Sequence, residues 1–364
     1  GRGLYGVAGA GMGHAVRTRP VVEHLLAQGH DVCLVAGGRA FDYLSASFKR
    51  VIRVANVPIM YRDGAVHDSL TAFENVRRLP MYVSSFRLAR FVVKRWKPDV
   101  VITDLEPFTA WAAWLGRLPV LSVGNHQVLT RTGSLVSSHF GLDVLKSRLV
   151  TWVLTPRASR YLVYWPDSRV DVRPGTVIVD PPVRAEVVRA KPMRGEHVFV
   201  YQTSDSNKRL IEALKEVDAR FVVYGYHRAG LEGNITFREF NEAQFYDDLA
   251  ACRAVITNGG FSLTSEALVL RKPLLISPVR KQYEQIHNAL EMERLGFGVF
   301  APVLTSDIIR AFLGDLSRYE SALSAYRHDG NKGCLAEIDG FIQKRIEGRQ
   351  RVQGSHSNEE RPLE

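Results

Sequence analysis

Two adjacent glycines separate an apolar run from a helical pattern, and this junction is the strongest candidate for a chemical site. Residues 254–256 form the apolar run, and Gly259-Gly260-Phe261-Ser262-Leu263-Thr264 follows soon after. A strand that turns into a helix through glycines directs free backbone N–H groups and the positive end of the helix dipole into one pocket. Such a pocket suits a diphosphate; the alternative is a tight turn without a ligand. We expect Glu266 about one turn further into the helix, within reach of a ribose hydroxyl pair.

A second polar cluster follows the next apolar run. Here Pro278 precedes Gln282-Tyr283-Glu284-Gln285-Ile286-His287-Asn288-Ala289, again after a predicted strand. Together the two segments predict a nucleotide-sugar site.

The elements that position these residues alternate between strand and helix. Apolar runs of four or five residues, bounded by Gly, Pro or Asp, are typical of buried parallel strands. In the first half we expect strands at 4–7, 31–35, 51–54, 99–102 and 119–123, and helices at 13–28, 70–95 and 108–115. In the second half we expect strands at 197–201, 220–224, 254–257 and 273–276, and helices at 208–217, 245–252, 263–270 and 282–295. This order predicts an α/β fold with two doubly wound, Rossmann-like domains.

The chain has 364 residues, a length that usually divides into two domains. The adjacent Pro181 and Pro182 resist both helix and sheet pairing, and end the first series of strands. We therefore expect an N-terminal domain at 1–180, a linker at 181–195 and a C-terminal domain at 196–316. A terminal helix at 317–348 and a disordered polar tail at 349–364 complete the expected order. The ligand would lie between the domains, at the carboxyl ends of both sets of strands.

These motifs, taken together, resemble those of the GT-B glycosyltransferases, and the likeness spans both domains. The donor-site signature is carried by Gly259 to Ser262, Glu266, Glu284-Gln285 and Asn288-Ala289. Gly11-Met12-Gly13-His14, with Gly29-His30 after the next helix, resembles the N-terminal signature. The UDP-glycosyltransferase group and the lipid-linked N-acetylglucosaminyltransferase of peptidoglycan synthesis are the most similar members. The resemblance implies a GT-B fold, in which the N-terminal domain binds the acceptor and the C-terminal domain binds a nucleotide sugar.

The resemblance also implies roles for individual residues. These are diphosphate binding by Gly259 to Thr264, ribose binding by Glu266, donor-sugar binding by Glu284 and Gln285, and base catalysis by His14. The chain departs from the plant-type motif, which has a histidine in place of Asn258. It also places Arg17-Thr18-Arg19 between His14 and Pro20, where the family has a proline closer to the histidine.

Inverting transfer requires a base that takes the proton of the acceptor hydroxyl as this attacks the anomeric carbon. Imidazole suits this task near neutral pH. His14 follows a Gly-rich turn at a predicted helix start; the alternative is a histidine bonded to the backbone. Asp104, after a strand, either orients His14 or caps the helix that begins near Pro107. On the acceptor side we expect Gly13, Asn125 and His126, with a satisfied loop histidine as the alternative for His126.

Further donor contacts are expected from loops of the C-terminal domain. Thr203 and Ser204 follow the strand 197–201 and suit a phosphate, with a helix cap as the alternative. Phe240 follows a predicted strand near the expected position of the uracil base; the alternative is a phenylalanine packed in the core, which is the commoner role. No Asp-x-Asp motif stands at a strand end, so we expect no metal and no cofactor apart from the UDP-sugar co-substrate.

The net charge of +10 favours acidic partners without choosing among them. Basic residues Arg87, Arg90, Lys94 and Lys97 recur at helical spacing, so they either dock on anionic lipid or form a solvated face. Three scattered cysteines favour a reducing, cytoplasmic compartment, and no apolar run approaches the about 20 residues needed to span a bilayer. If the basic residues dock on lipid, we expect the protein on the inner face of the cell membrane.

The sequence thus favours an inverting, metal-independent glycosyltransferase that moves a sugar from a UDP-sugar to a hydroxyl, on a lipid-linked or other glycan precursor. A nucleotide-sugar 2-epimerase on the same fold is the nearest alternative. A non-catalytic nucleotide-sugar sensor and a nucleic-acid binding module are the others; the sequence has no recognised nucleic-acid motif to support the last.

Overall fold

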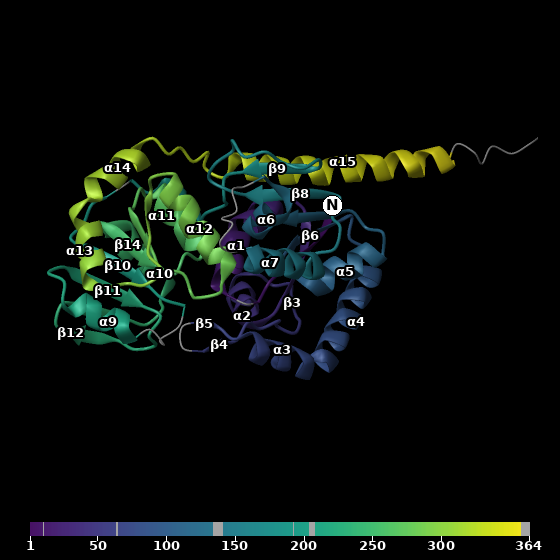
Figure 1. Ribbon diagram of the computed structural model, residues 1–364. Coiled ribbons are helices and arrows are strands. Elements are labelled where there is room, and N and C mark those ends of the chain that lie inside the picture. The colour runs from purple at the N-terminus through teal and green to yellow at the C-terminus, as the bar shows by residue number, and fades with distance from the viewer. Residues whose placement is uncertain (10, 63–64, 134–140, 192, 204–207, 358–364) are drawn as a thin grey trace, which may run out of the picture.

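The computed structural model describes residues 1–9, 11–62, 65–133, 141–191, 193–203 and 208–357. Among these residues the strands form two seven-stranded sheets and one small hairpin. The first sheet comes from the N-terminal half of the chain and the second from the C-terminal half, and the two halves lie side by side in Figure 1.

The N-terminal sheet has the order β3-β2-β1-β6-β7-β8-β9 and is parallel throughout. Its strands are β1 (Arg2–Val7), β2 (Asp31–Ala36), β3 (Val51–Arg53), β6 (Val100–Asp104), β7 (Val120–Val123), β8 (Arg160–Tyr164) and β9 (Thr176–Val179). The helices are α1 (Met12–Ala27), α2 (Gly38–Ser47), α3 (Asp68–Arg77), α4 (Leu79–Trp96), α5 (Pro107–Leu115), η1 (Asn125–Gln127), α6 (Val128–Arg131) and α7 (Gly141–Leu154). The hairpin pairs β4 (Tyr61–Arg62) with β5 (Ala65–Val66).

The C-terminal sheet has the order β12-β13-β11-β10-β14-β15-β16, with β12 antiparallel to its neighbour. Its strands are β10 (His197–Tyr201), β11 (Arg220–Tyr224), β12 (Gly230–Glu232), β13 (Ile235–Arg238), β14 (Ala254–Thr257), β15 (Leu274–Ile276) and β16 (Gly298–Phe300). The helices are α8 (Ala185–Arg189), α9 (Lys208–Lys215), α10 (Glu242–Ala251), α11 (Phe261–Val269), α12 (Tyr283–Arg294), α13 (Ser306–Gly314), α14 (Leu316–Ser324) and α15 (Lys332–Ser357).

Both sheets reverse their winding direction at the centre. Strand β1 lies between β2 and β6, and β10 lies between β11 and β14. Ligands of doubly wound sheets bind outside the carboxyl ends of the strands at such switch points. The predicted α/β architecture with two Rossmann-like domains is therefore confirmed. The catalytic and acceptor-side candidates lie at or after the carboxyl ends of β1, β6 and β7, and the glycine turn follows β14, next to these points.

Several elements differ from the expected ones. The helix expected at 70–95 is two helices that meet at Arg78, because Pro80 would remove a hydrogen bond inside a continuous helix but is tolerated in the first turn of α4. The short helix α8 lies in the predicted linker, after its prolines. Strands β8 and β9, which the pattern analysis does not include, complete the N-terminal sheet.

The C-terminal helix α15 packs against the N-terminal domain, along which it runs in Figure 1. Its apolar residues Cys334, Ile338, Phe341 and Ile342 are buried in the same cluster as the strands of the N-terminal sheet. Helix α15 also continues to Ser357, into the stretch where we expected a disordered tail. Once the first turns are fixed by packing, adding further residues to a helix costs little. Residues 358–364 lie outside the described part of the chain.

Candidate active site

The glycine turn places the first turn of α11 at the carboxyl end of β14. Gly259 has a φ of +86°, and a Cβ there would lie 2.8 Å from Ile276 Cγ2, so the turn requires glycine. Gly260 is the N-cap, and no side chain caps the helix. The backbone N–H groups of the first turn are therefore available to an anion at the positive end of the helix.

Asn258, which stands where the plant-type motif has a histidine, holds the loops of this turn together. Its side chain is buried; Oδ1 accepts from the Thr203 backbone N–H at 2.9 Å, and Nδ2 donates to Gln202 Oε1 and to the Ser277 carbonyl, each at 3.0 Å. The amide thereby links the ends of β10, β14 and β15.

Glu266 is buried in α11 and forms a two-pronged ion pair with Arg184, from the start of α8. Arg184 Nε lies 2.7 Å from Oε1 and Nη2 lies 2.8 Å from Oε2. Each carboxylate oxygen keeps a second lone pair, so the pair does not exhaust the hydroxyl-accepting capacity of Glu266. Burial opposes the charge of Arg184, but Glu266 outweighs it and raises the pKa of the guanidinium. Sequence patterns did not identify Arg184.

His14, in the first turn of α1, is hydrogen-bonded to Asp104 at the end of β6. Its Nδ1 lies 2.9 Å from Asp104 Oδ1, and its side chain keeps 17% of its surface exposed while that of Asp104 is fully buried. The helix-cap alternative for Asp104 is wrong, because Glu106 caps α5 by accepting from the N–H groups of Phe108 and Thr109. The contact suits a base oriented by an acid.

Arg17, one turn along α1 from His14, neutralises Asp104. Its Nε and Nη2 donate to the two oxygens of Asp104, each at 2.6 Å, and the guanidinium is 4% exposed. Burial alone would raise the pKa of Asp104, but Arg17 and then His14 reverse this and hold it well below its ordinary value. Sequence patterns did not identify Arg17 as a site residue. Its spacing of three residues from His14, which places both residues on the same helix face, could have indicated it.

Asn125 connects this network to the C-terminal domain. Its Oδ1 accepts from Arg17 Nη1 at 2.6 Å, and its Nδ2 donates to Glu284 Oε1 at 2.8 Å. Because Arg17 only donates and ionised Glu284 only accepts, the orientation of the amide is fixed. Gln285, the predicted partner of Glu284, is buried, and its Oε1 accepts from the Val279 N–H at 2.9 Å.

His126 is buried beside Asp104, at 3.9 Å from Nδ1 to Oδ1. Gly124 makes room for it, since a Cβ at this φ of +130° would lie 2.7 Å from the ring. Neither ring nitrogen has a hydrogen-bond partner among the described residues. Burial lowers the pKa of His126 to about 3, with Asp104 opposing the shift. The alternative of a satisfied loop histidine therefore fails in this structure.

The two domains meet directly at the site. Ser262 Oγ donates to the Gly13 carbonyl oxygen at 2.8 Å, which joins the first turns of α11 and α1. The rings of Phe261 and Trp165 stack at 5.6 Å, nearly parallel. These contacts place the first turn of α1, which carries His14, next to the first turn of α11.

A family model described as glycosyl transferase family 1 matches residues 1–317. The chain belongs to this family. It is an enzyme, a glycosyltransferase of the GT-B type, as the resemblance implied.

Known proteins similar to this glycosyltransferase cover nearly its whole length. The UDP-N-acetylglucosamine--N-acetylmuramyl-(pentapeptide) pyrophosphoryl-undecaprenol N-acetylglucosamine transferase of Erwinia tasmaniensis is 26% identical over 373 residues, which cover 93% of this chain and 98% of that protein. The solved glycotransferase of kitacinnamycin has a TM-score of 0.66 at 18% identity, covering 94% of this chain and 99% of its own. MurG of Acinetobacter baumannii has a TM-score of 0.58 at 13% identity, covering 93% and 99%. At these identities the two solved structures support the fold alone.

The remaining predicted donor residues of the glycosyltransferase fall into three groups. Leu263 and Thr264 lie in the first turn of α11, and Thr264 Oγ1 is buried without a hydrogen-bond partner among the described residues. Phe240 is 54% exposed after β13 and packs against Phe245, so it is not a core residue. Thr203 is exposed after β10, whereas Ser204 lies outside the described residues.

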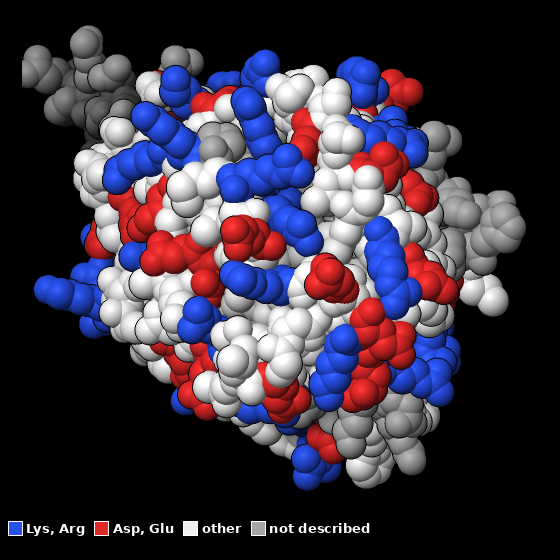
Figure 2. All heavy atoms as spheres, turned by 90° about the vertical axis from the view of Figure 1, so that its left-hand side faces the viewer, with Lys and Arg blue, Asp and Glu red and all other residues white. Residues whose placement is uncertain are grey.

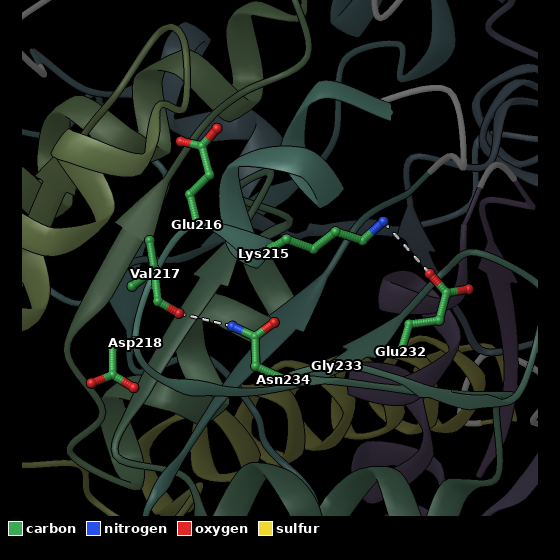
Figure 3. A pocket seen from close by; sticks show the side chains of 7 residues that line it. All are labelled: Lys215, Glu216, Val217, Asp218, Glu232, Gly233 and Asn234. Atoms are coloured by element: carbon green, nitrogen blue, oxygen red, sulfur yellow. Dashed lines mark hydrogen bonds and ion pairs between the residues drawn. The ribbon is translucent and has the colours of Figure 1, made fainter.

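A broad surface depression of the glycosyltransferase lies away from this site. It has a volume of about 710 Å³ and is lined by residues 215–218 and 232–234, where Asn234 donates to the Val217 carbonyl and Lys215 faces Glu232 (Figure 3). These residues precede β11 and β13, at the amino ends of the strands, whereas the glycine turn follows the carboxyl end of β14. Because these strands are parallel, the depression is at the opposite edge of the sheet from the glycine turn.

The charges of the glycosyltransferase are mixed on the outer face of the C-terminal domain. Figure 2 shows basic and acidic side chains interspersed there, rather than one basic stripe.

On α4, by contrast, Arg87, Lys94 and Lys97 are exposed and Arg90 is half-buried. Phe91, on the same helix, is 63% exposed. The helix also buries Ser85, Ala89 and Val92, so it has a core-facing side as well as this basic and apolar surface. No helix in the described part of the chain is long and apolar enough to span a membrane.

Proposed function

We propose that this glycosyltransferase transfers a sugar, with inversion, from a UDP-sugar to a hydroxyl of a lipid-linked acceptor. The observation that supports this most is the pair His14–Asp104: His14 stands in the first turn of α1, which the Gly13–Ser262 hydrogen bond joins to the uncapped first turn of α11. Direct displacement at an anomeric carbon requires a base for the attacking hydroxyl on one side of the sugar and a group that binds the anionic leaving group on the other.

The donor is proposed to lie on α11. Its diphosphate accepts hydrogen bonds from the backbone N–H groups of Gly260 to Leu263, and the unpartnered Thr264 Oγ1 adds a hydroxyl donor. The ribose hydroxyls donate to the free lone pairs of Glu266, which Arg184 holds in place. The exposed ring of Phe240 offers an apolar surface to the uracil base of the donor.

The transfer is a single displacement. His14 takes the proton of the acceptor hydroxyl as its oxygen attacks the anomeric carbon, and the bond from that carbon to the diphosphate oxygen breaks. The electron pair leaves with UDP, whose charge the helix end stabilises. No residue pair of the Asp-x-Asp type follows a strand in the sequence, so we propose that the reaction needs no divalent metal.

The acceptor is proposed from the relatives. The Erwinia tasmaniensis protein is named for a pyrophosphoryl-undecaprenol acceptor. The exposed basic and apolar residues of α4 offer a surface that can bind anionic lipid. A lipid-linked acceptor resides in the same membrane as that lipid. The buried ring nitrogens of His126 and the amide of Asn125 are proposed to line the acceptor side.

Thermal shift with a panel of nucleotide sugars, followed by transfer to a polyprenyl-pyrophosphoryl N-acetylmuramyl pentapeptide, tests this function. A ligand at 100 times its Kd stabilises the folded state by about 2.7 kcal/mol, so a cognate donor stands out. We expect UDP release that depends on the acceptor, persists in EDTA and gives a β-linked product from an α-linked donor. Isomerised sugar from UDP-N-acetylglucosamine alone would instead identify an epimerase, and absence of binding by every donor would reject the proposal.

A further inference from the structure

The buried Arg17 guanidinium stands beside the proposed base without a contact to the proposed donor. We propose that Arg17 is a positioning residue, which keeps the proton of neutral His14 on Nδ1 and leaves Nε2 free to act as the base. This inference rests on the proposed function of His14, and it assigns to Arg17 a task that the motif resemblance does not.

The first step is the immobilisation of Asp104. Arg17 Nε lies 2.6 Å from Oδ2 and Nη2 lies 2.6 Å from Oδ1, so both carboxylate oxygens are held at once. A fully buried carboxylate persists in its ionised form when it is paired and hydrogen-bonded. Asp104 therefore remains an acceptor, with Oδ1 aimed at His14.

The second step is the choice of tautomer. His14 Nδ1 lies 2.9 Å from Asp104 Oδ1 and also 2.9 Å from Arg17 Nη2. It therefore either donates to the carboxylate or accepts from the guanidinium. Donation is favoured, because a lone pair on Nδ1 would otherwise face the lone pairs of an ionised oxygen, and the hydrogen bond to that oxygen is charge-assisted. This tautomer carries its free lone pair on Nε2, as a base requires.

The third step concerns the charge around the ring. The groups that face it are Arg17 from α1, Asp104 from β6, His126 from η1 and, through Asn125, Glu284 from α12. Arg17 and Asp104 carry opposite charges at equal distances from Nδ1, so neither charge acts on the ring alone. Without Arg17, the buried Asp104 carboxylate would favour a doubly protonated ring, which is not a base. His126 adds no charge near neutral pH, since burial lowers its pKa to about 3.

The fourth step is the link to the donor domain. Arg17 Nη1 fixes Asn125, whose Nδ2 reaches Glu284 of α12. One guanidinium therefore orients the acid behind the base and the amide that contacts the predicted donor-sugar residue. Lysine cannot replace it, because one ammonium does not hold two carboxylate oxygens and an amide in this planar geometry.

Nitrogen-15 NMR of the full chain with labelled histidine tests the tautomer without any substrate. The resonances of His14 are assigned by their loss in His14→Gln, and Nε2 is distinguished by its coupling to both ring C–H protons. We expect, in the wild type near neutral pH, a protonated Nδ1 and an unprotonated Nε2. A wild-type ring protonated on Nε2 alone overturns the proposal.

Kinetics of Arg17 variants test its consequence. In Arg17→Met we expect kcat to fall about 10²-fold at neutral pH, with part of the loss recovered at higher pH. The donor KM should rise less than kcat falls, through the loss of support for the Asn125–Glu284 contact. Arg17→Lys retains a cation, folds without leaving Asp104 unpaired, and should show a smaller pH shift. Added guanidinium should restore part of the rate of Arg17→Ala, which a merely structural defect would not allow. Arg310→Met is the control, because the exposed Arg310 pairs with Asp307 within α13, away from the site.

A wild-type pH–rate profile in Arg17→Met and Arg17→Lys, without rescue, refutes the role of Arg17 while leaving the transferase proposal intact. If the wild type instead transfers no sugar from any donor of the panel, the proposed function fails, and the NMR result still decides the tautomer.

Discussion

The Ser262 hydroxyl donates to the carbonyl oxygen of Gly13 at 2.8 Å, and so ties the first turn of α11 in one domain to the first turn of α1 in the other. The two first turns carry the proposed donor site and the proposed base. The hydrogen bond therefore helps to set how far the proposed base lies from the proposed donor site, and the stacking of Phe261 on Trp165 is a second contact between the domains.

Replacing Ser262 by alanine is expected to weaken this contact between the domains. A hydrogen bond of this kind contributes about 1 kcal/mol, so kcat/KM should fall about fivefold, chiefly through the donor KM. Ser265→Ala is the matched control, because Ser265 Oγ bonds to the Phe261 carbonyl within the same helix and does not cross the cleft. Equal effects of both substitutions on the donor KM would contradict a role for this contact.

Replacing His14 by alanine is expected to abolish most of the transfer while preserving donor binding. Loss of a general base typically lowers the rate about 10²- to 10⁴-fold, while the donor-dependent rise in melting temperature should persist. His24→Ala is the control: His24 lies at the other end of α1 and is likewise bonded to a carboxylate, 2.8 Å from Asp339. Near-normal turnover of the His14 variant would remove it from the mechanism.

The Arg184–Glu266 pair is expected to behave as a unit. Removing Arg184 leaves Glu266 buried without its counter-ion and should lower the free energy of unfolding by about 3–5 kcal/mol. Removing Glu266 should cost less, because Arg184 Nη1 also lies 3.6 Å from Glu242 Oε1. The double variant Arg184→Met/Glu266→Met should lose less than the sum of the two single losses, as a denaturant-based double-mutant cycle would measure. Each variant with Glu266 replaced should also lose the thermal shift given by UDP. Additive losses in stability would show that the ion pair contributes little.

Stability is expected to fall as the pH is lowered from 7 to 5, in part because of His126. Its folded-state pKa is lowered to about 3 by burial, whereas an unfolded histidine has a pKa of about 6.5. Below the latter value the unfolded chain binds a proton that the folded chain does not, so folding loses about 2 kcal/mol by pH 5. The contribution of the neutral His126 ring to folding stability is therefore complete above about pH 6.5, and it decreases as the pH falls towards the folded-state pKa.

Urea titrations at pH 7 and pH 5 measure this difference. His126→Gln should show a pH-dependent loss about 2 kcal/mol smaller than that of the wild type. The exposed His227, replaced by asparagine, should leave the difference unchanged. An unaltered pH dependence in His126→Gln would mean that this ring does not remain neutral in the folded state.

Helix α4 is expected to bind anionic vesicles. Each basic residue near such a surface contributes about 1 kcal/mol, so Arg87→Gln/Lys94→Gln should weaken sedimentation with phosphatidylglycerol vesicles about 30-fold. The control Arg220→Gln/Arg318→Gln makes the same change in net charge on the C-terminal domain, at two exposed positions. Identical sedimentation of both double variants would exclude α4 as the docking surface.

The sequence by itself determined the alternation of strands and helices, the glycine turn and the position of Glu266 in the following helix. These features depend on local periodicity and on backbone conformations that glycine adopts, and both are encoded within a few residues. The same local information contained the break at Pro80, which the helical pattern alone obscured.

The tertiary structure decided the partners of the charged residues. Arg17 and Asp104 are 87 positions apart, and Arg184 and Glu266 are 82 apart. Their pairing depends on which strand ends the sheet order brings together, and a periodic pattern does not contain that order. For the same reason the return of α15 to the N-terminal domain, and the burial of His126 beside Asp104, follow from packing between distant segments rather than from the residues on either side of them.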